Sequence, residues 1–169
     1  MAVAASQLVL VAQGAPQASE DDVKAAYLYQ FTKYIEWPAG STVANDSITM
    51  CVAGDAGVVG GLQKIAGDEA RAGRKVVIRQ DPDMARTGEC RILFVGRVEE
   101  QRFAGFLKAL EGKPTLIAGD DLPFLRRGGM VAFIVQDRKL RFSISLAATE
   151  TAHLKVSSQL LRHAVQVIQ

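Results

Sequence analysis

Apolar residues recur every three or four positions between Val23 and Ile35, which predicts a strongly amphipathic helix. Ser19 is expected to cap its start. Pro38 is expected to end it at Trp37, because proline disfavours helical geometry in the residue before it. The predicted apolar face consists of Val23, Tyr27, Phe31, Tyr34 and Ile35. Tyr29 is predicted to point away from that face.

The same helix concentrates the aromatic side chains, because all three tyrosines and the only tryptophan lie between Tyr27 and Trp37. Two interpretations are open. In the first, the helix packs on a sheet through its apolar face. In the second, Tyr29, Tyr34 and Trp37 also face a ligand or a partner protein.

Short apolar runs alternate with helical patterns through the middle of the chain. Strands are expected at 48–53, 75–79, 91–95 and 115–118, and helices at 57–67 and 99–110. Alternation at this spacing is typical of β-α-β units with right-handed connections, and it predicts a mostly parallel sheet.

The pattern changes near the C-terminus. A loop is expected at 121–129, two antiparallel strands at 130–135 and 140–146, and a closing helix at 157–168. Residues 19–169 are therefore predicted to form a single three-layer α/β domain. Its mostly parallel central sheet carries a C-terminal antiparallel hairpin, and helices cover both faces.

Charge and hydropathy bear on two questions, namely whether the protein binds nucleic acid and whether it is exported. The formal net charge is +2 without a concentrated basic stripe, so no nucleic-acid partner is expected. Residues 1–18 carry no charge and contain the apolar run 8–12, followed by Ala15 and Ala18. This segment is similar to the second half of a secretory signal cleaved before Ser19 or Glu20, although a basic start is missing. The alternative is a disordered or weakly helical tail.

The chain has two cysteines, Cys51 and Cys90, and each lies in a segment predicted to be a strand. Their spacing does not match a C-x-x-C redox or zinc motif. In an exported protein they would form one structural disulfide, which would stabilise the fold by roughly 4 kcal/mol in the chain-entropy model. The alternative is a pair of buried free thiols in a cytoplasmic protein.

Motifs for catalysis are missing from the sequence. It contains no nucleophile elbow, no P-loop and no dinucleotide fingerprint, and His153 and His163 are not spaced as metal ligands. An enzyme, a cofactor and a metal site are therefore not expected. Asp55 and Asp120 follow predicted parallel strands, where open α/β sheets bind ligands, but such residues also cap helices.

Five basic residues cluster around the predicted hairpin: Arg126, Arg127, Arg138, Lys139 and Arg141. Arginine suits bidentate contacts with carboxylate or phosphate, so this cluster is a candidate site for an anionic ligand or an acidic partner surface. The alternative is a solvated hairpin that charge protects from edge-to-edge aggregation.

Four stretches taken in order are similar to one known family. They are AAYLYQFTKYIEWP at 25–38, the cysteine-bearing strands CVAG at 51–54 and CRILFV at 90–95, the hairpin GGMVAF with LRFSI at 128–144, and SSQLLR at 157–162 followed by Ala164. Together they resemble the YfiR family of periplasmic regulators. Ser145 stands where that family's hairpin motif has asparagine, and a second cysteine pair found in some relatives is missing.

The resemblance implies an exported α/β protein without enzymatic activity. Such proteins bind the periplasmic sensor region of a membrane-bound diguanylate cyclase and lower cyclic di-GMP and biofilm formation. The resemblance also implies that a Cys51–Cys90 disulfide keeps the inhibitor folded and makes it sensitive to reduction. An exposed apolar patch would also allow a homodimer. The alternative function is a periplasmic small-ligand sensor or binding protein that serves another envelope signalling system, with the ligand near Asp55 and Asp120 or against Arg141.

Overall fold

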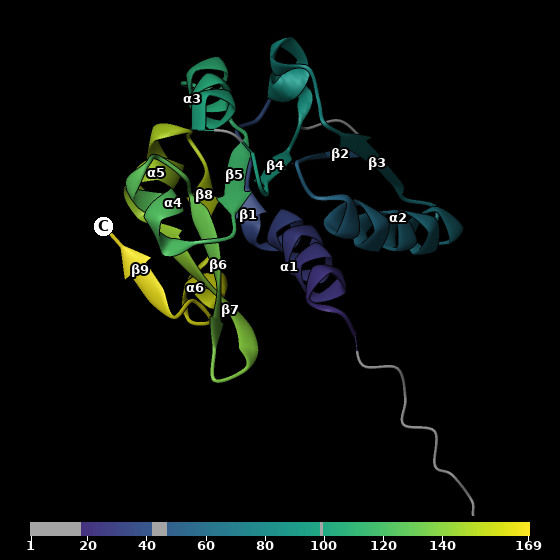
Figure 1. Cartoon of the computed structure of the whole chain (residues 1–169). Coiled ribbons are helices and arrows are strands. Elements are labelled where there is room, and N and C mark those ends of the chain that lie inside the picture. The colour runs from purple at the N-terminus through teal and green to yellow at the C-terminus, as the bar shows by residue number, and fades with distance from the viewer. Residues whose placement is uncertain (1–17, 42–46, 99) are drawn as a thin grey trace, which may run out of the picture.

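The computed structural model describes residues 18–41, 47–98 and 100–169, and a seven-stranded sheet lies at its centre (Figure 1). The strand order is β3-β2-β4-β5-β6-β7-β9. The strands are β2 (Ser47–Ala53), β3 (Lys75–Gln80), β4 (Ile92–Val95), β5 (Leu116–Gly119), β6 (Val131–Gln136), β7 (Lys139–Ser145) and β9 (Gln166–Ile168). Only β6 and β7 pair antiparallel within it, so the predicted α/β class is confirmed. The signal-like segment lies outside the described residues, apart from Ala18.

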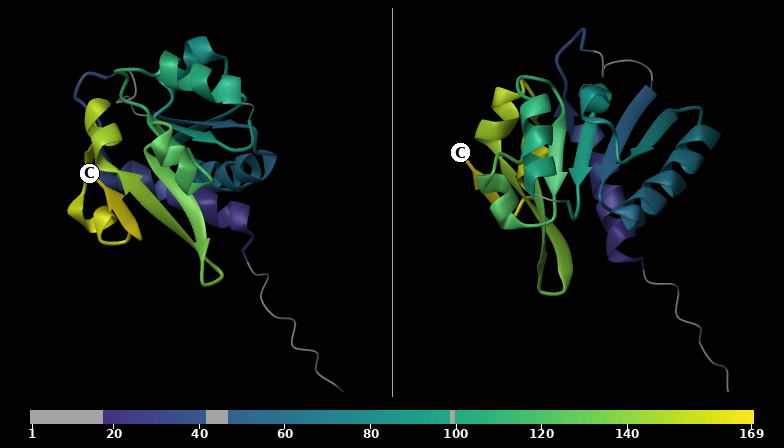
Figure 2. Two further views of the ribbon diagram at one scale, coloured as in Figure 1. Left: turned by 60° about the vertical axis from the view of Figure 1, so that its left-hand side comes forward. Right: turned by 45° about the horizontal axis from the view of Figure 1, so that its top comes forward.

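Helices cover both faces of this sheet (Figure 2). They are α1 (Glu20–Tyr34), α2 (Ala56–Arg71), η1 (Met84–Glu89), α3 (Glu100–Ala109), α4 (Leu122–Arg126), α5 (Leu146–Thr151) and α6 (Ser158–Leu161). The chain passes from β2 to β3, which is one edge strand of the sheet. It then crosses back to β4 on the other side of β2, and β5 lies next to β4 in the same direction. Because such crossovers are right-handed, this reversal places α2 and α3 on opposite faces. Helix α1 packs against α2 on the same face.

The start of α1 follows the predicted capping pattern. The Ser19 hydroxyl accepts a hydrogen bond from the Asp22 backbone N–H at 3.1 Å and donates one to the Asp22 carboxylate at 2.8 Å. The predicted end at Trp37 is wrong, since the helix stops at Tyr34. Ile35 and Glu36 form the short strand β1 (Ile35–Glu36), which pairs antiparallel with β8 (Lys155–Val156).

The burial of α1 differs from the predicted apolar face. Phe31 and Ile35 are buried, whereas Val23, Tyr27 and Tyr34 are half-buried. Tyr29, predicted to point away from that face, is nevertheless only 6% exposed. The reason is that α1 is covered on two sides, by the sheet and by α2. The helices approach closely at Gly61, where an added Cβ would lie 2.8 Å from the Ala25 Cβ.

The other large difference lies at the C-terminus. The helix predicted over 157–168 is a single turn, α6, and the chain then forms β9, which runs parallel to β7. The Val165 N–H donates to the Phe142 carbonyl at 2.9 Å as β9 approaches the otherwise open edge of β7. The predicted loop 121–129 contains α4, which Asp121 caps by accepting from the Phe124 N–H at 2.8 Å.

The β6–β7 hairpin is joined by a two-residue turn. Asp137 and Arg138 have φ values of 51° and 58°, as type I′ hairpin turns require. Figures 1 and 2 show the hairpin projecting past the sheet at the same end as the start of α1. Ser145, at the end of β7, caps α5 by accepting from the Ala148 N–H at 3.3 Å. Serine and asparagine are similarly good N-caps, so this departure from the family's motif preserves a capping residue.

Candidate functional site

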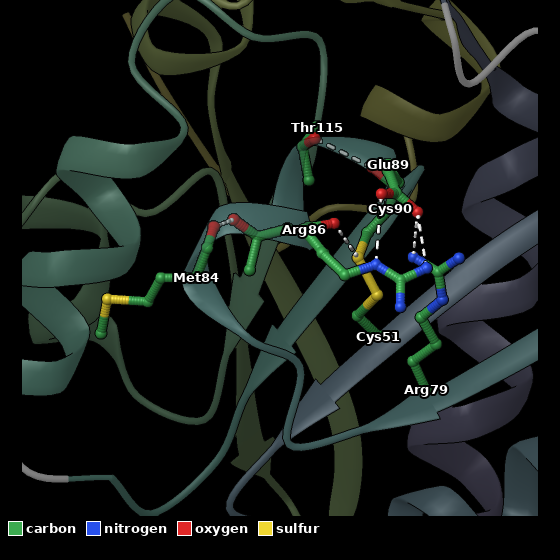
Figure 3. Close-up of a disulfide and its surroundings, with 8 residues drawn as sticks. Cys51, Arg79, Met84, Arg86, Glu89, Cys90 and Thr115 are labelled. Atoms are coloured by element: carbon green, nitrogen blue, oxygen red, sulfur yellow. Dashed lines mark hydrogen bonds and ion pairs between the residues drawn. A yellow bond between two sulfur atoms is a disulfide. The ribbon is translucent and has the colours of Figure 1, made fainter.

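A disulfide joins Cys51 on β2 to Cys90, which follows η1 and precedes β4 (Figure 3). The two Cα atoms are 5.8 Å apart, and both residues are buried. The prediction of a Cys51–Cys90 disulfide is therefore confirmed. The bridge ties the crossover from β3 to β4 onto β2, the second strand from the β3 edge, which already pairs with β4.

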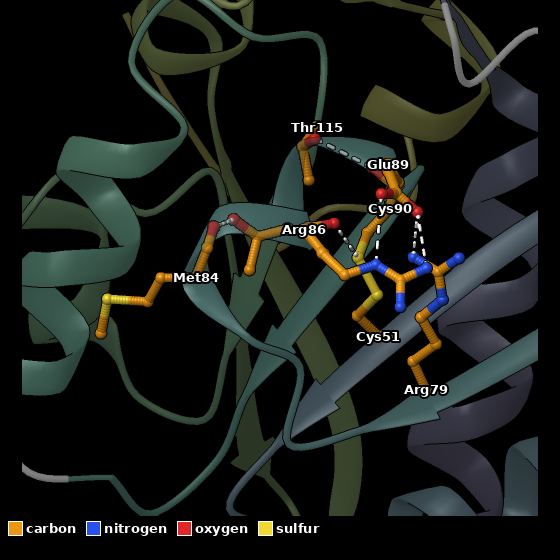
Figure 4. A network of polar contacts seen from close by, with 8 residues as sticks. Cys51, Arg79, Met84, Arg86, Glu89, Cys90 and Thr115 are labelled. Atoms are coloured by element: carbon orange, nitrogen blue, oxygen red, sulfur yellow. Dashed lines mark hydrogen bonds and ion pairs between the residues drawn. A yellow bond between two sulfur atoms is a disulfide. The ribbon is translucent and has the colours of Figure 1, made fainter.

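The surroundings of the disulfide form a compact polar network (Figure 4). Glu89 accepts hydrogen bonds from Arg79 on β3 at 2.6 Å and from Arg86 at 3.3 Å. The charges and hydrogen bonds of Arg86 and Arg79 lower the pKa of Glu89. The buried Thr115 hydroxyl donates to the Cys90 carbonyl at 2.9 Å. These contacts hold η1 against both β3 and β5, so the bridge sits in a fixed and enclosed setting.

The sheet reverses its strand order between β2 and β4, and this is where open α/β sheets usually bind ligands. The loops after these two strands pack backbone to backbone. Gly54 has a φ of +74°, and an added Cβ there would lie 2.4 Å from the Arg97 carbonyl oxygen. Asp55 caps α2 by accepting from the Val58 N–H at 3.0 Å. Asp55 therefore has a structural task, and its predicted role in ligand binding stays a prediction.

A pocket of about 580 Å³ lies beside this reversal, at the carboxyl ends of β4, β5 and β6; we call it the edge pocket. Its charged lining residues are Glu20, Lys24, Arg97, Asp120, Asp121 and Arg127, and its apolar ones include Ile134, Val135 and Leu140 of the hairpin. Lys24 is the most buried of the charged side chains that form ion pairs here. It lies 2.9 Å from Glu20 and 2.9 Å from Asp120, so it ties α1 to the end of β5.

In the cluster of Glu20, Lys24 and Asp120, burial and the ion pairs shift the pKa values of Lys24 and Asp120 in opposite directions. Burial by itself lowers the pKa of Lys24, but its hydrogen bonds to Asp120 and Glu20 outweigh burial and raise the pKa overall. Burial raises the pKa of Asp120, and the nearby charges of Asp55 and Glu20 raise it further, whereas Lys24 lowers it. Lys24 is thus held as a cation between two carboxylates.

A second pocket, of about 500 Å³, lies between α1 and the hairpin; we call it the hairpin groove. Val23, Tyr27, Val135 and Leu140 supply its apolar surface. Its charged lining residues are Arg138, Lys139, Arg141 and Glu20. Within the described part of the chain, none of these three cations forms an ion pair with a carboxylate. Val135 is 62% exposed. The structure therefore brings one of the helix aromatics and the predicted basic hairpin to one surface.

The remaining candidate residues are dispersed. Tyr34 and Trp37 lie at the opposite end of α1, and Trp37 lines a small pocket of about 250 Å³ with His153 and Lys155. The Arg91 guanidinium lies 5.2 Å from the Trp37 ring centre. Arg127 lines the edge pocket and pairs with Glu100 at 2.6 Å, whereas Arg126 is exposed and lines neither the edge pocket nor the hairpin groove. The candidate partner-binding residues thus do not form one surface; they are Tyr29, Tyr34, Trp37, Arg126 and Arg127.

Tyr29 serves the contact between α1 and α2. Its side chain lies beside Glu69 of α2, which forms an ion pair with Arg74. The Lys33 ammonium lies 4.7 Å from the centre of the Tyr29 ring. Burial and the Glu69 charge raise the pKa of Tyr29, while Arg74 and Tyr29 together lower the pKa of Glu69 to about 2.

This network predicts a pH dependence of stability. The Glu69 pKa falls from its ordinary value of 4.5 to about 2 in the folded protein. Its contribution is therefore complete above pH 4.5 and is lost as the pH falls toward 2. Thermal unfolding of the wild type and of Glu69→Gln should show a melting-temperature gap near neutral pH that shrinks over this acid range. A gap that does not change with pH would contradict the assignment.

Lys24 was not among the residues selected from the sequence, although Glu20 and Lys24 have the i, i+4 spacing of a helical ion pair. Such pairs usually lie in solvent, so the pattern gave no sign of burial. In the part of the chain that the structure describes, no group of three or more His, Cys, Asp or Glu residues could hold a metal ion. Among these same residues, no helix is long and apolar enough to span a membrane.

Comparisons with known proteins agree with this architecture. The family model described as YfiR/HmsC-like, DUF4154, matches residues 21–165. A conserved domain protein from Vibrio cholerae O1 biovar El Tor superposes with a TM-score of 0.56 at 10% identity, over 88% of this chain and 60% of that one. The ABC domain from Streptococcus pneumonia, solved with L-Trp, gives a TM-score of 0.56 at 10% identity, over 85% and 60%. The chain thus spans about 60% of the length of these two structures. None of the curated proteins matches the sequence.

Proposed function

Because this chain belongs to the YfiR/HmsC-like family, we propose that it is a periplasmic regulator that binds and represses a membrane-bound diguanylate cyclase. The family-model match over residues 21–165 carries this proposal, since the family is generally regulatory rather than catalytic. The Cys51–Cys90 disulfide supports export, because structural disulfides persist in oxidising compartments such as the periplasm. Repression of the cyclase would lower cyclic di-GMP and biofilm formation.

We place the contact with the cyclase at the hairpin groove. Arg138, Lys139 and Arg141 give the groove an excess of positive charge around an apolar surface that includes the exposed Val135, since the one carboxylate in the lining, Glu20, pairs with Lys24. This combination suits a partner segment in which acidic side chains flank an apolar anchor, because charge complementarity steers association and the buried apolar contact adds affinity. The partner surface we propose is therefore an acidic segment of the cyclase's periplasmic region.

The first test is intracellular cyclic di-GMP in a clean deletion of this gene. The level should rise and should return to normal when a plasmid supplies the wild-type gene. An unchanged level would refute repression of a cyclase and favour the alternative, a sensor serving another envelope system. The edge pocket, with a buried lysine among convergent polar groups, is the observation that favours that alternative.

The second test distinguishes loss of the contact surface from loss of the folded structure. The double variant Arg138→Glu/Arg141→Glu reverses the charge of the groove and should fail to restore low cyclic di-GMP in the deletion strain. The matched control is Lys108→Glu/Arg162→Glu, which makes the same change of charge at two exposed positions outside the groove. Both proteins should keep wild-type melting temperatures. Full complementation by the groove variant would exclude this surface.

A further inference from the structure

The charged groups of the edge pocket are largely paired with one another. Lys24 bridges Glu20 and Asp120, and the Arg127 guanidinium lies 2.6 Å from Glu100 and 3.6 Å from Asp121. Lys24 and Arg127 could pair with an anionic ligand only by leaving their carboxylates, and Arg97, the lining cation without an ion pair among the described residues, is exposed. Leaving the buried Lys24 without its carboxylate partners is costly, so this cluster opposes a ligand that would draw Lys24 away from them.

The paired groups nevertheless keep capacity for hydrogen bonds. Each carboxylate oxygen accepts two hydrogen bonds, and an ammonium group has three donors, of which the two ion pairs of Lys24 use two. Arg97 adds a guanidinium fork at the pocket wall and forms no ion pair within residues 18–41, 47–98 and 100–169. The lining therefore offers many acceptors and donors at once, which matches hydroxyl groups, because a hydroxyl both donates and accepts.

The third feature is the apolar side of the pocket. Ile134, Val135 and Leu140 of the hairpin face the charged residues of α1 and of the loop after β5. This surface can cover the C–H face of a ring whose hydroxyls are bonded on the other side. The volume of about 580 Å³ is within the range of about 300–1,000 Å³ typical of small-molecule sites.

From these features we propose that the edge pocket binds a small uncharged polyol, of the size of a monosaccharide or disaccharide. Glu20, Asp120 and Asp121 accept hydrogen bonds from its hydroxyls, and Arg97 and Lys24 donate to them. The existing ion pairs stay intact when the ligand enters. This binding site adjoins the hairpin groove, with which it shares Glu20, Val135 and Leu140, but it does not depend on the identity of the partner protein.

The test uses the purified protein and isothermal titration calorimetry, with probes that share one ring and differ in charge. The probes are galactose, galacturonate and galactosamine, the corresponding glucose series, and the uncharged disaccharides maltose and trehalose. At least one uncharged member should show saturable binding, and its charged counterparts should bind about tenfold more weakly or worse. Failure of every uncharged probe, or tighter binding of a charged one, would overturn the proposal.

Two variants locate the site. Arg97→Gln and Asp121→Asn should each raise the Kd of the binding sugar about tenfold, as expected for removing a hydrogen bond to a charged group. Asparagine keeps the cap of α4, and Arg97 is exposed, so both proteins should fold normally. Arg126→Gln, an exposed arginine outside the pocket, is the matched control and should bind like the wild type. An unchanged Kd in Arg97→Gln and Asp121→Asn would show that the sugar binds elsewhere. Because no cyclase is present in this assay, its result is independent of the proposed repression.

Discussion

The double variant Cys51→Ala/Cys90→Ala is expected to lose roughly 4 kcal/mol of unfolding free energy, since the disulfide closes a loop over a sequence separation of 39. The bridge restricts the unfolded chain, and in the folded protein it fastens η1 and the start of β4 to β2. Both cysteines are buried, so small cavities add to the loss. Chemical denaturation of the oxidised wild type and the variant would measure the difference.

Reduction supplies the control for this prediction. A reductant should destabilise the wild type by a similar amount and leave the double variant unchanged. If the protein is a cyclase repressor, the variant should also be less abundant and cyclic di-GMP should rise, because a loss of this size is a large fraction of typical domain stability. Wild-type stability and normal repression in the variant would refute a structural role for the disulfide.

Lys24→Met is expected to lower the unfolding free energy by about 2–3 kcal/mol. Methionine keeps much of the side-chain volume but leaves Glu20 and Asp120 without their shared cation. Removing one partner of a fully buried ion pair costs about 3–5 kcal/mol. The expected value is smaller because the two carboxylate side chains are 55% and 35% exposed. Urea denaturation at neutral pH would measure the change.

Lys64→Met is the matched control, because Lys64 also pairs with a carboxylate of α1, Asp22, but is 72% exposed. It should cost less than about 1 kcal/mol. The pH profile gives a second check. The pKa of Lys24 is raised above its ordinary value of 10.5, so its contribution should be constant through neutral pH and should be lost only in more alkaline solution. Equal losses in Lys24→Met and Lys64→Met would contradict the burial of Lys24.

Local patterns determined much of the fold. Strands predicted at 48–53, 75–79, 91–95 and 115–118 lie within one residue of those observed, because buried parallel strands need continuous apolar runs. The Ser19 cap, the hairpin and the placement of both cysteines next to sheet strands also follow from short segments. Among the candidate site residues, the sequence identified Asp120 and Arg127 of the edge pocket and the three cations of the hairpin groove.

Only the tertiary structure decided which polar side chains are buried. Lys24 and Tyr29 occupy ordinary surface patterns of a helix, but α2 and the loop after β5 cover them, and those neighbours are distant in sequence. The last segment forms β9 rather than a helix because the free edge of β7 offers hydrogen bonds that a short amphipathic segment cannot match by itself. The sequence by itself thus determined the central strands, the hairpin and the two cysteines that form the disulfide. The packing of α1 between the sheet and α2 determined which residues line the pockets.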